Sequence, residues 1–144
     1  MADQQKRIRM KAVSESMRAW AEALRRELES WPGVTLKSAF GMIMAYRKGT
    51  VFAALPRTRA IFEDDAILLK FNRETPTLLK RIAAEARFTP GTMEQRHQNK
   101  KKGGEGRRWR IFLTRSDADV NAAIEWLSEA YRSAVKSPSP RNAG

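Results

Sequence analysis

Cysteine is absent from this sequence of 144 residues, and histidine occurs only once. Without cysteine the chain cannot form disulfide bonds, use a catalytic thiolate or bind zinc through sulfur. The single histidine excludes a multi-histidine metal site and leaves little for histidine-based acid–base catalysis. No set of nucleophile, base and orienting residue stands out either. We therefore expect no enzymatic activity, no metal and no cofactor.

Long hydrophobic runs are also missing. The longest uncharged run, residues 38–46, is nine residues long, whereas a membrane-spanning helix needs about 20 apolar residues. The first residues are charged and lack the apolar segment of a secretory signal. These absences predict a cytoplasmic protein without a membrane partner.

The length and composition are those of one folded domain. A chain of about 150 residues can bury about 70% of its unfolded surface, and 42% of these residues are hydrophobic. The Ser137-Pro138-Ser139-Pro140 segment would break any helix that precedes it. We therefore expect a single domain over residues 1–136 and a disordered tail over residues 137–144.

Apolar periodicity and capping residues predict three helices. The spacing of Met17, Leu24 and Leu28 predicts a long amphipathic helix over residues 4–30. Thr75 and Pro76 are typical of a helix start and predict a helix over residues 76–87. Ser116 is expected to cap the last helix, over residues 117–135. Its predicted buried face comprises Val120, Ala123, Ile124, Leu127, Tyr131, Ala134 and Val135.

Short runs rich in β-branched, aromatic and aliphatic residues predict strands between these helices. They cover residues 34–40, 42–47, 51–55 and 66–71, then a short segment at 92–95 and a strand at 109–114. The resulting order is α-β-β-β-β-α-β-β-α. This order favours the α+β class, with a single antiparallel sheet packed by helices on one face.

Several short motifs, in order and spacing, resemble the YjbR/MmcQ proteins and the related N-terminal domain of TfoX. The resemblance spans roughly residues 20–135, and the residues that carry it follow. They are Trp31-Pro32-Gly33-Val34, Phe40-Gly41, Tyr46 with Gly49, Phe52-Ala53 and Leu55, Leu68-Leu69-Lys70-Phe71, Trp109 and Ser128-Glu129-Ala130-Tyr131.

This resemblance implies a small α+β domain with one antiparallel sheet, of the kind compared with secretion chaperones and with CyaY, a frataxin-like fold. Members of the family have been regarded as DNA-binding proteins, and the resemblance brings no active site. The chain departs from the family pattern between Lys101 and Trp109, where a basic segment is inserted.

The net charge of +12 is distributed unevenly. Residues 96–110 contain seven basic side chains and one acidic side chain, so half of the net charge lies in fifteen residues. We call this stretch the basic segment. Its candidate nucleic-acid-binding residues are Arg96, Lys100, Lys101, Lys102, Arg107, Arg108 and Arg110.

The basic segment predicts non-specific, salt-sensitive contact with the phosphates of a nucleic acid, because lysine and arginine neutralise phosphates and release counterions. A solvated loop that only keeps the protein soluble is the alternative. Trp109 is expected to be a core residue, with stacking on a base as the alternative. The Gly103-Gly104-Glu105-Gly106 stretch lacks the spacing of a P-loop, so we do not expect it to bind phosphate in that way. We also expect no metal at His97 or at residues 63–65, which are expected to be solvated.

A second hypothesis is a protein–protein interaction module, including a homodimer. Met42, Met44 and Phe52 lie among the predicted strands. Alternating core positions are the simpler interpretation, but methionine-rich surfaces also adapt to partner proteins. An apolar sheet face lined by these residues would bind such a partner.

Overall fold

The computed structural model describes residues 10–61, 65–92 and 109–134. In this part of the chain, five strands form an antiparallel open sheet in the order β2-β3-β4-β6-β7. The strands are β2 (Val34–Ala39), β3 (Met42–Arg47), β4 (Thr50–Pro56), β6 (Ala66–Lys70) and β7 (Trp109–Leu113). A separate two-stranded sheet pairs β1 (Met10–Ala12) with β5 (Arg59–Ile61). The predicted α+β class with one main antiparallel sheet is confirmed.

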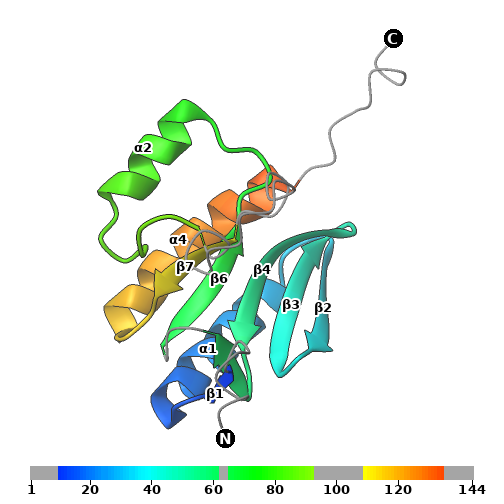
Figure 1. The fold of residues 1–144 in the computed structure, drawn as a ribbon. Helices are drawn as coiled ribbons and strands as arrows, with labels where there is room; N and C mark the ends of the chain where they lie inside the picture. The colour runs from blue at the N-terminus through cyan, green and yellow to red at the C-terminus, as the bar shows by residue number, and fades with distance from the viewer. Residues whose placement is uncertain (1–9, 62–64, 93–108, 135–144) are drawn as a thin grey trace, which may run out of the picture.

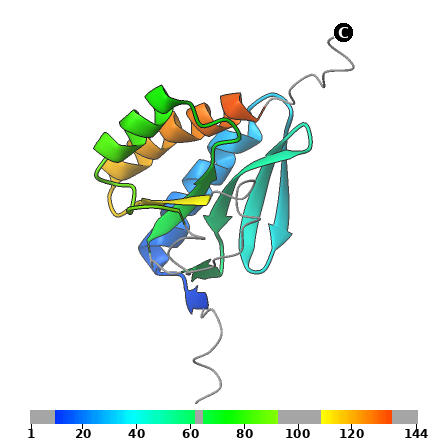
Figure 2. The same cartoon turned by 45° about the horizontal axis from the view of Figure 1, so that its top comes forward.

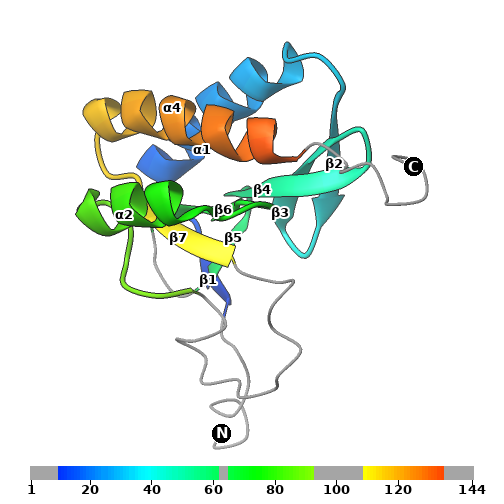
Figure 3. The same cartoon turned by 90° about the horizontal axis from the view of Figure 1, so that it is seen from above.

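The described residues form three helices, which pack on one face and near one edge of this sheet. α1 (Glu15–Glu29) and α4 (Asp117–Ser133) lie side by side on one face (Figures 1 and 2). α2 (Pro76–Ala84) lies beside α4, near the β7 edge of the sheet. Figure 3 shows that the β1–β5 pair is on the side of the sheet away from α1 and α4. The main sheet therefore has one helix-covered face and a second face, which we call the open face because none of the described helices covers it.

The main core lies between the sheet and the helices. Phe52, Phe112 and Leu127 are completely buried in it. Trp126 of α4 contacts Phe88 edge to face, with ring centroids 4.9 Å apart. Burying such residues fully contributes about 1.5–3 kcal/mol each, so this layer supplies most of the driving force for folding.

The sequence predicted only part of the buried face of α4. Ala123 and Leu127 are buried as expected, but Trp126 and Ala130 are buried as well. The reason is that α4 packs against the segment after α2 as well as against the sheet, and the Trp126 indole donates to Glu85 of that segment. Predicted residue Val135 lies outside the described residues.

Polar side chains begin all three described helices. Ser14 accepts a hydrogen bond from the Met17 amide, Thr75 from Leu78 and Ser116 from Asp119, each at 3.1 Å. The predicted caps Thr75 and Ser116 are therefore confirmed. The predicted start of the first helix is wrong for residues 10–14, because residues 10–12 pair with β5 as a strand and Ser14 caps α1.

Two tight turns join the first three strands of the main sheet. Phe40-Gly41 connects β2 to β3, and Lys48-Gly49 connects β3 to β4, with positive φ at all four residues. This is the backbone pattern of a type I′ turn, which matches the twist of antiparallel strands. A change of register in β4 leaves Phe52 without a partner on β3, since Tyr46 pairs with Val51 and Ala45 with Ala53. The bulge lets Phe52 and Ala53 both join the helix-side core.

The strand predictions hold except at two places. Strand β5 lies in a segment that the sequence predicted as a connection. After α2, Phe88 forms a bridge with Phe112, and the amides of Thr89 and Leu113 complete the pairing with β7. The strand expected at 92–95 is not seen at Thr92, and residues 93–95 lie outside the described residues, as does the expected tail.

Candidate functional site

Six of the seven predicted nucleic-acid-binding residues lie outside the described residues: Arg96, Lys100, Lys101, Lys102, Arg107 and Arg108. The seventh, Arg110, is the second residue of β7. The described part of the chain resumes at Trp109, the first residue of β7.

Arg110 is held inside the fold. Its Nε and Nη2 atoms donate to the two carboxylate oxygens of Glu74, at 3.0 and 3.2 Å. The side chains are only 12% and 6% exposed. A bidentate pair of this kind is short, directional and strong. The charge of Arg110 is therefore matched within the protein by the charge of Glu74.

Trp109 lies on the opposite side of β7 from Arg110. Successive side chains of a strand point to opposite faces, and the cross-strand partner of Arg110 is Leu69, a residue of the helix-side core. Trp109 instead packs against a second apolar cluster. It is half-buried there, so the prediction of a core position is only partly met.

The second apolar cluster covers the middle of the open face. Its buried members are Met42, Ala54, Ala66, Leu68 and Ile111, and its partly buried members are Met44, Trp109 and Leu113. The sequence predicted one role for Met42, Met44 and Phe52, but the structure separates them. The methionines belong to the open face, whereas Phe52 faces the helices because of the bulge in β4.

Basic and aromatic side chains gather at one end of the open face. Lys70 is the cross-strand partner of Trp109. Tyr46 belongs to the same face, and the Lys37 ammonium lies over its ring, 5.5 Å from the centroid. We call Trp109, Lys70, Tyr46 and Lys37 the Trp109 end of the open face. With about 4.8 Å between strands, it extends about 14 Å from β7 to β3.

Sequence reasoning had not placed Tyr46, Lys70 and Lys37 in a site. The alternation of β3 would have put Tyr46 on the same face as Met42 and Met44. The meeting of Lys70 with Trp109, however, depends on how β6 and β7 pair, and 38 positions separate the two residues in the sequence.

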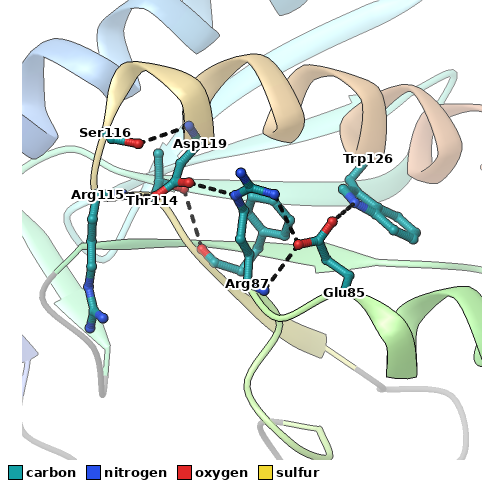
Figure 4. Close-up of polar contacts among 8 residues, drawn as sticks. Glu85, Arg87, Thr114, Arg115, Ser116, Asp119 and Trp126 are labelled. Atoms are coloured by element: carbon teal, nitrogen blue, oxygen red, sulfur yellow. Dashed lines mark hydrogen bonds and ion pairs between the residues drawn. The ribbon is translucent and has the colours of Figure 1, made fainter.

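A polar network joins the segment after α2 to the start of α4 (Figure 4). The Arg87 guanidinium donates to Asp119 and, at 3.0 Å, to Glu85. The Trp126 indole donates to the other Glu85 oxygen at 3.3 Å, and the Arg115 amide donates to Asp119 at 2.8 Å. All four carboxylate oxygens therefore have partners within the fold.

The carboxylates of this network are kept ionised. Burial raises the pKa of Glu85, but hydrogen bonds from the Arg87 amide, Trp126 and the Arg87 side chain outweigh it, so the net pKa is below the usual value. For Asp119, too, burial raises the pKa, and donation by Arg87 and the Arg115 amide brings it below its usual range. An acid–base catalyst at neutral pH needs a pKa shifted toward 7. The network is thus a structural clamp between α2, β7 and α4.

Metal-ligand geometry is missing from residues 10–61, 65–92 and 109–134, where no three histidine, aspartate or glutamate side chains come together. His97, Glu63 and Asp64 lie outside these ranges. Asp65 accepts a hydrogen bond from the Ser14 hydroxyl at 3.0 Å, which ties the start of β6 to the cap of α1. Among the helices that the structure describes, none is long and apolar enough to cross a membrane.

Comparison with known proteins gives no relative. The chain matches no protein-family model, and no curated protein or solved structure is similar to it.

Proposed function

We propose that this protein is a small, non-enzymatic nucleic-acid-binding domain of the YjbR/MmcQ-like kind, which contacts mostly phosphates and has little base preference. The observation that carries the proposal is the position of Trp109. This residue directly follows the six cations of residues 96–108, and its ring lies on the open face beside Lys70 rather than in the helix-side core.

The Trp109 end of the open face offers two kinds of contact. Trp109 and Tyr46 are both half-buried aromatic residues, and we expect unpaired bases to stack on their rings, an interaction worth about 1–3 kcal/mol per base. Lys70 and Lys37 add positive charge beside these rings. Sheets that stack bases on aromatic side chains and hold phosphates with cations are a common way of binding single strands. This combination favours single-stranded over duplex nucleic acid.

The basic segment supplies most of the electrostatic attraction. Six of its cations lie within residues 96–108 and are followed at once by Trp109. If about five phosphates are neutralised, the logarithm of the affinity for a single strand falls with that of the salt concentration with a slope of about −3.5. Between about 50 and 200 mM salt, binding then weakens by about a hundredfold.

Fluorescence anisotropy with labelled single-stranded DNA, duplex DNA and RNA tests the proposal. We expect binding at low salt that weakens steeply with added salt. Replacing Lys100, Lys101 and Lys102 by glutamate should abolish it. A control of equal charge change, with glutamate at Arg26, Lys80 and Arg132, should retain most of the affinity, because these residues belong to the helices and not to the open face. Failure of all three nucleic acids to bind at about 50 mM salt would contradict the proposal.

Trp109→Ala separates stacking from charge. The net charge is unchanged, so the salt slope should remain, while affinity for single strands falls by about fivefold or more. The matched control is Trp20→Ala, since Trp20 belongs to α1 on the other face and donates to Asp117. An equal loss of affinity in both variants would show that Trp109 does not contact the nucleic acid.

The apolar part of the open face supports a second candidate, a protein–protein interaction module. Met44, Trp109 and Leu113 are only partly buried, and Phe40 in the β2–β3 turn is 86% exposed. Light scattering at low and high salt distinguishes the two candidates. Dimers that persist at high salt support the interaction module, whereas a monomer that binds polyanions only at low salt supports the first proposal.

A further inference from the structure

A cleft of about 570 Å³ lies on the helix side of the molecule, away from the open face. One wall is α1, which contributes Arg18, Ala21, Glu22 and Arg25. The other wall comes from β3, β4 and the residue that follows β4, and contributes Ile43, Leu55, Pro56 and Arg57. The volume is in the usual range for small-molecule sites.

The floor of the cleft is apolar, and four charged side chains line the rest of it. Ala21, Leu55 and Pro56 are buried, and Ile43 is half-buried. The Cβ and ring atoms of these residues carry no hydrogen-bonding groups, so a ligand in contact with them must present an apolar body.

The charges at the mouth of the cleft do not cancel. Glu22 is fully engaged, accepting from Arg25 Nη2 at 2.6 Å, from Arg25 Nε at 3.0 Å and from Arg26 at 3.3 Å. Hydrogen bonding to Arg25 lowers the pKa of Glu22 to about 2, so the carboxylate stays ionised and bound to its arginines. Arg25 also reaches Glu29, at 3.2 Å.

Two arginines of the cleft have no carboxylate partner in the described part of the chain. Among the contacts of the described residues, the Arg18 side chain has no hydrogen bond or ion pair. Arg57 donates from Nη1 only to the Ser38 hydroxyl, at 3.2 Å. That contact directs one guanidinium edge but does not neutralise its charge. The cleft therefore combines an apolar interior with two unmatched guanidinium groups, which favour an anion.

We infer that this cleft binds a small organic anion, consisting of an aromatic or branched aliphatic body and one phosphate or carboxylate group. The body packs on the half-buried Ile43 above the buried floor of Ala21, Leu55 and Pro56, and Arg18 and Arg57 hold the anionic group. We prefer this ligand to a second copy of the chain as the occupant of the cleft. The exposed apolar side chain that a second copy could insert is Phe40, and the residue near it is the basic Lys37 rather than an acidic one. The Phe40 turn therefore does not match the positive charge of the two arginines.

Titration of the ¹⁵N-labelled protein with phenyl phosphate and phenylacetate tests the inference by NMR. Both probes should shift the amides of residues 18–25, 54, 55 and 57 in a saturable manner, and the tighter of the two identifies the preferred anionic group. Inorganic phosphate has the anionic group without the apolar body, and the neutral 2-phenylethanol has the apolar body without the charge. Each should therefore bind at least about tenfold more weakly.

Arg18→Gln and Arg57→Gln should each weaken binding of the better probe by about five- to tenfold. Both side chains are exposed, so the variants should fold, as their spectra would show. Arg132→Gln is the matched control, since this arginine lies outside the cleft and pairs with Glu129. Nucleic-acid affinity should change by less than about twofold in all three variants, so this inference and the proposed function can fail separately.

Three outcomes would overturn the inference. The first is that no probe produces saturable shifts at concentrations up to about 10 mM, because a specific site of this kind would have a lower dissociation constant than that. The second is equal binding of 2-phenylethanol and phenyl phosphate, which would show an apolar cleft without anion recognition. The third is a concentration-dependent shift of the same amides without any probe, which would show that a second copy of the chain occupies the cleft.

Discussion

Replacing Arg110 by methionine tests whether this residue of the basic segment holds the fold together. The substitution keeps an unbranched side chain but leaves the Glu74 carboxylate, which is 6% exposed, without its bidentate partner. Breaking a buried pair by removing one partner costs about 3–5 kcal/mol. Arg110 retains 12% exposure, so we expect the lower end, about 3 kcal/mol. For a domain of this size, that corresponds to a melting temperature lower by about 6–12 °C.

Urea unfolding of four proteins measures the effect: the wild type, Arg110→Met, Glu74→Gln and the double variant. Because each single variant already breaks the Arg110–Glu74 pair, the double variant should be less destabilised than the sum of the two, with a coupling of about 2 kcal/mol. Arg26→Met serves as the control, since Arg26 is 74% exposed and its pair with Glu22 is solvated. Its unfolding midpoint should not change measurably.

Nucleic-acid binding provides the second measurement on Arg110→Met. If Arg110 has only the internal role, its loss lowers stability and leaves the affinity of the folded protein within about twofold. Unchanged stability together with weaker binding would refute this assignment and return Arg110 to the binding surface.

Three further predictions concern stability. The pKa values of Asp119 and Glu85 are lowered in the fold, so both carboxylates stabilise it fully above the unfolded pKa of about 4, and this contribution is lost as pH falls through the lower folded values. Urea midpoints should therefore drop as the pH falls below about 4, and less so in Asp119→Asn; an identical drop in the variant would exclude Asp119 as a source. Phe52→Ala should lower the free energy of unfolding by about 3–5 kcal/mol, measured by calorimetry, because Phe52 is fully buried. A decrease below about 1 kcal/mol would contradict a bulge that directs Phe52 into the helix-side core. Gly49→Ala should cost about 1 kcal/mol from its φ of 89° alone, as no atom lies within 4 Å of an added Cβ, and an unchanged melting temperature would contradict a left-handed turn there.

Local signals in the sequence determined much of the secondary structure. Thr75 and Ser116 were recognisable as caps because a cap depends only on its own side chain and the amides that follow. Strand β3 agrees with its predicted bounds, since its two glycine-containing turns enforce its ends. The concentration of charge before Trp109 was likewise evident from the sequence.

Long-range pairing decided the remaining features. Residues 10–12 form a strand because β5, almost fifty residues later, offers them a partner. The register of β7 against β6 turned Arg110 toward Glu74 and Trp109 toward the open face beside Lys70. A strand pattern has period two and is the same for either choice of face, so only the packing of the helices on one side tells which residues become core and which remain available for binding.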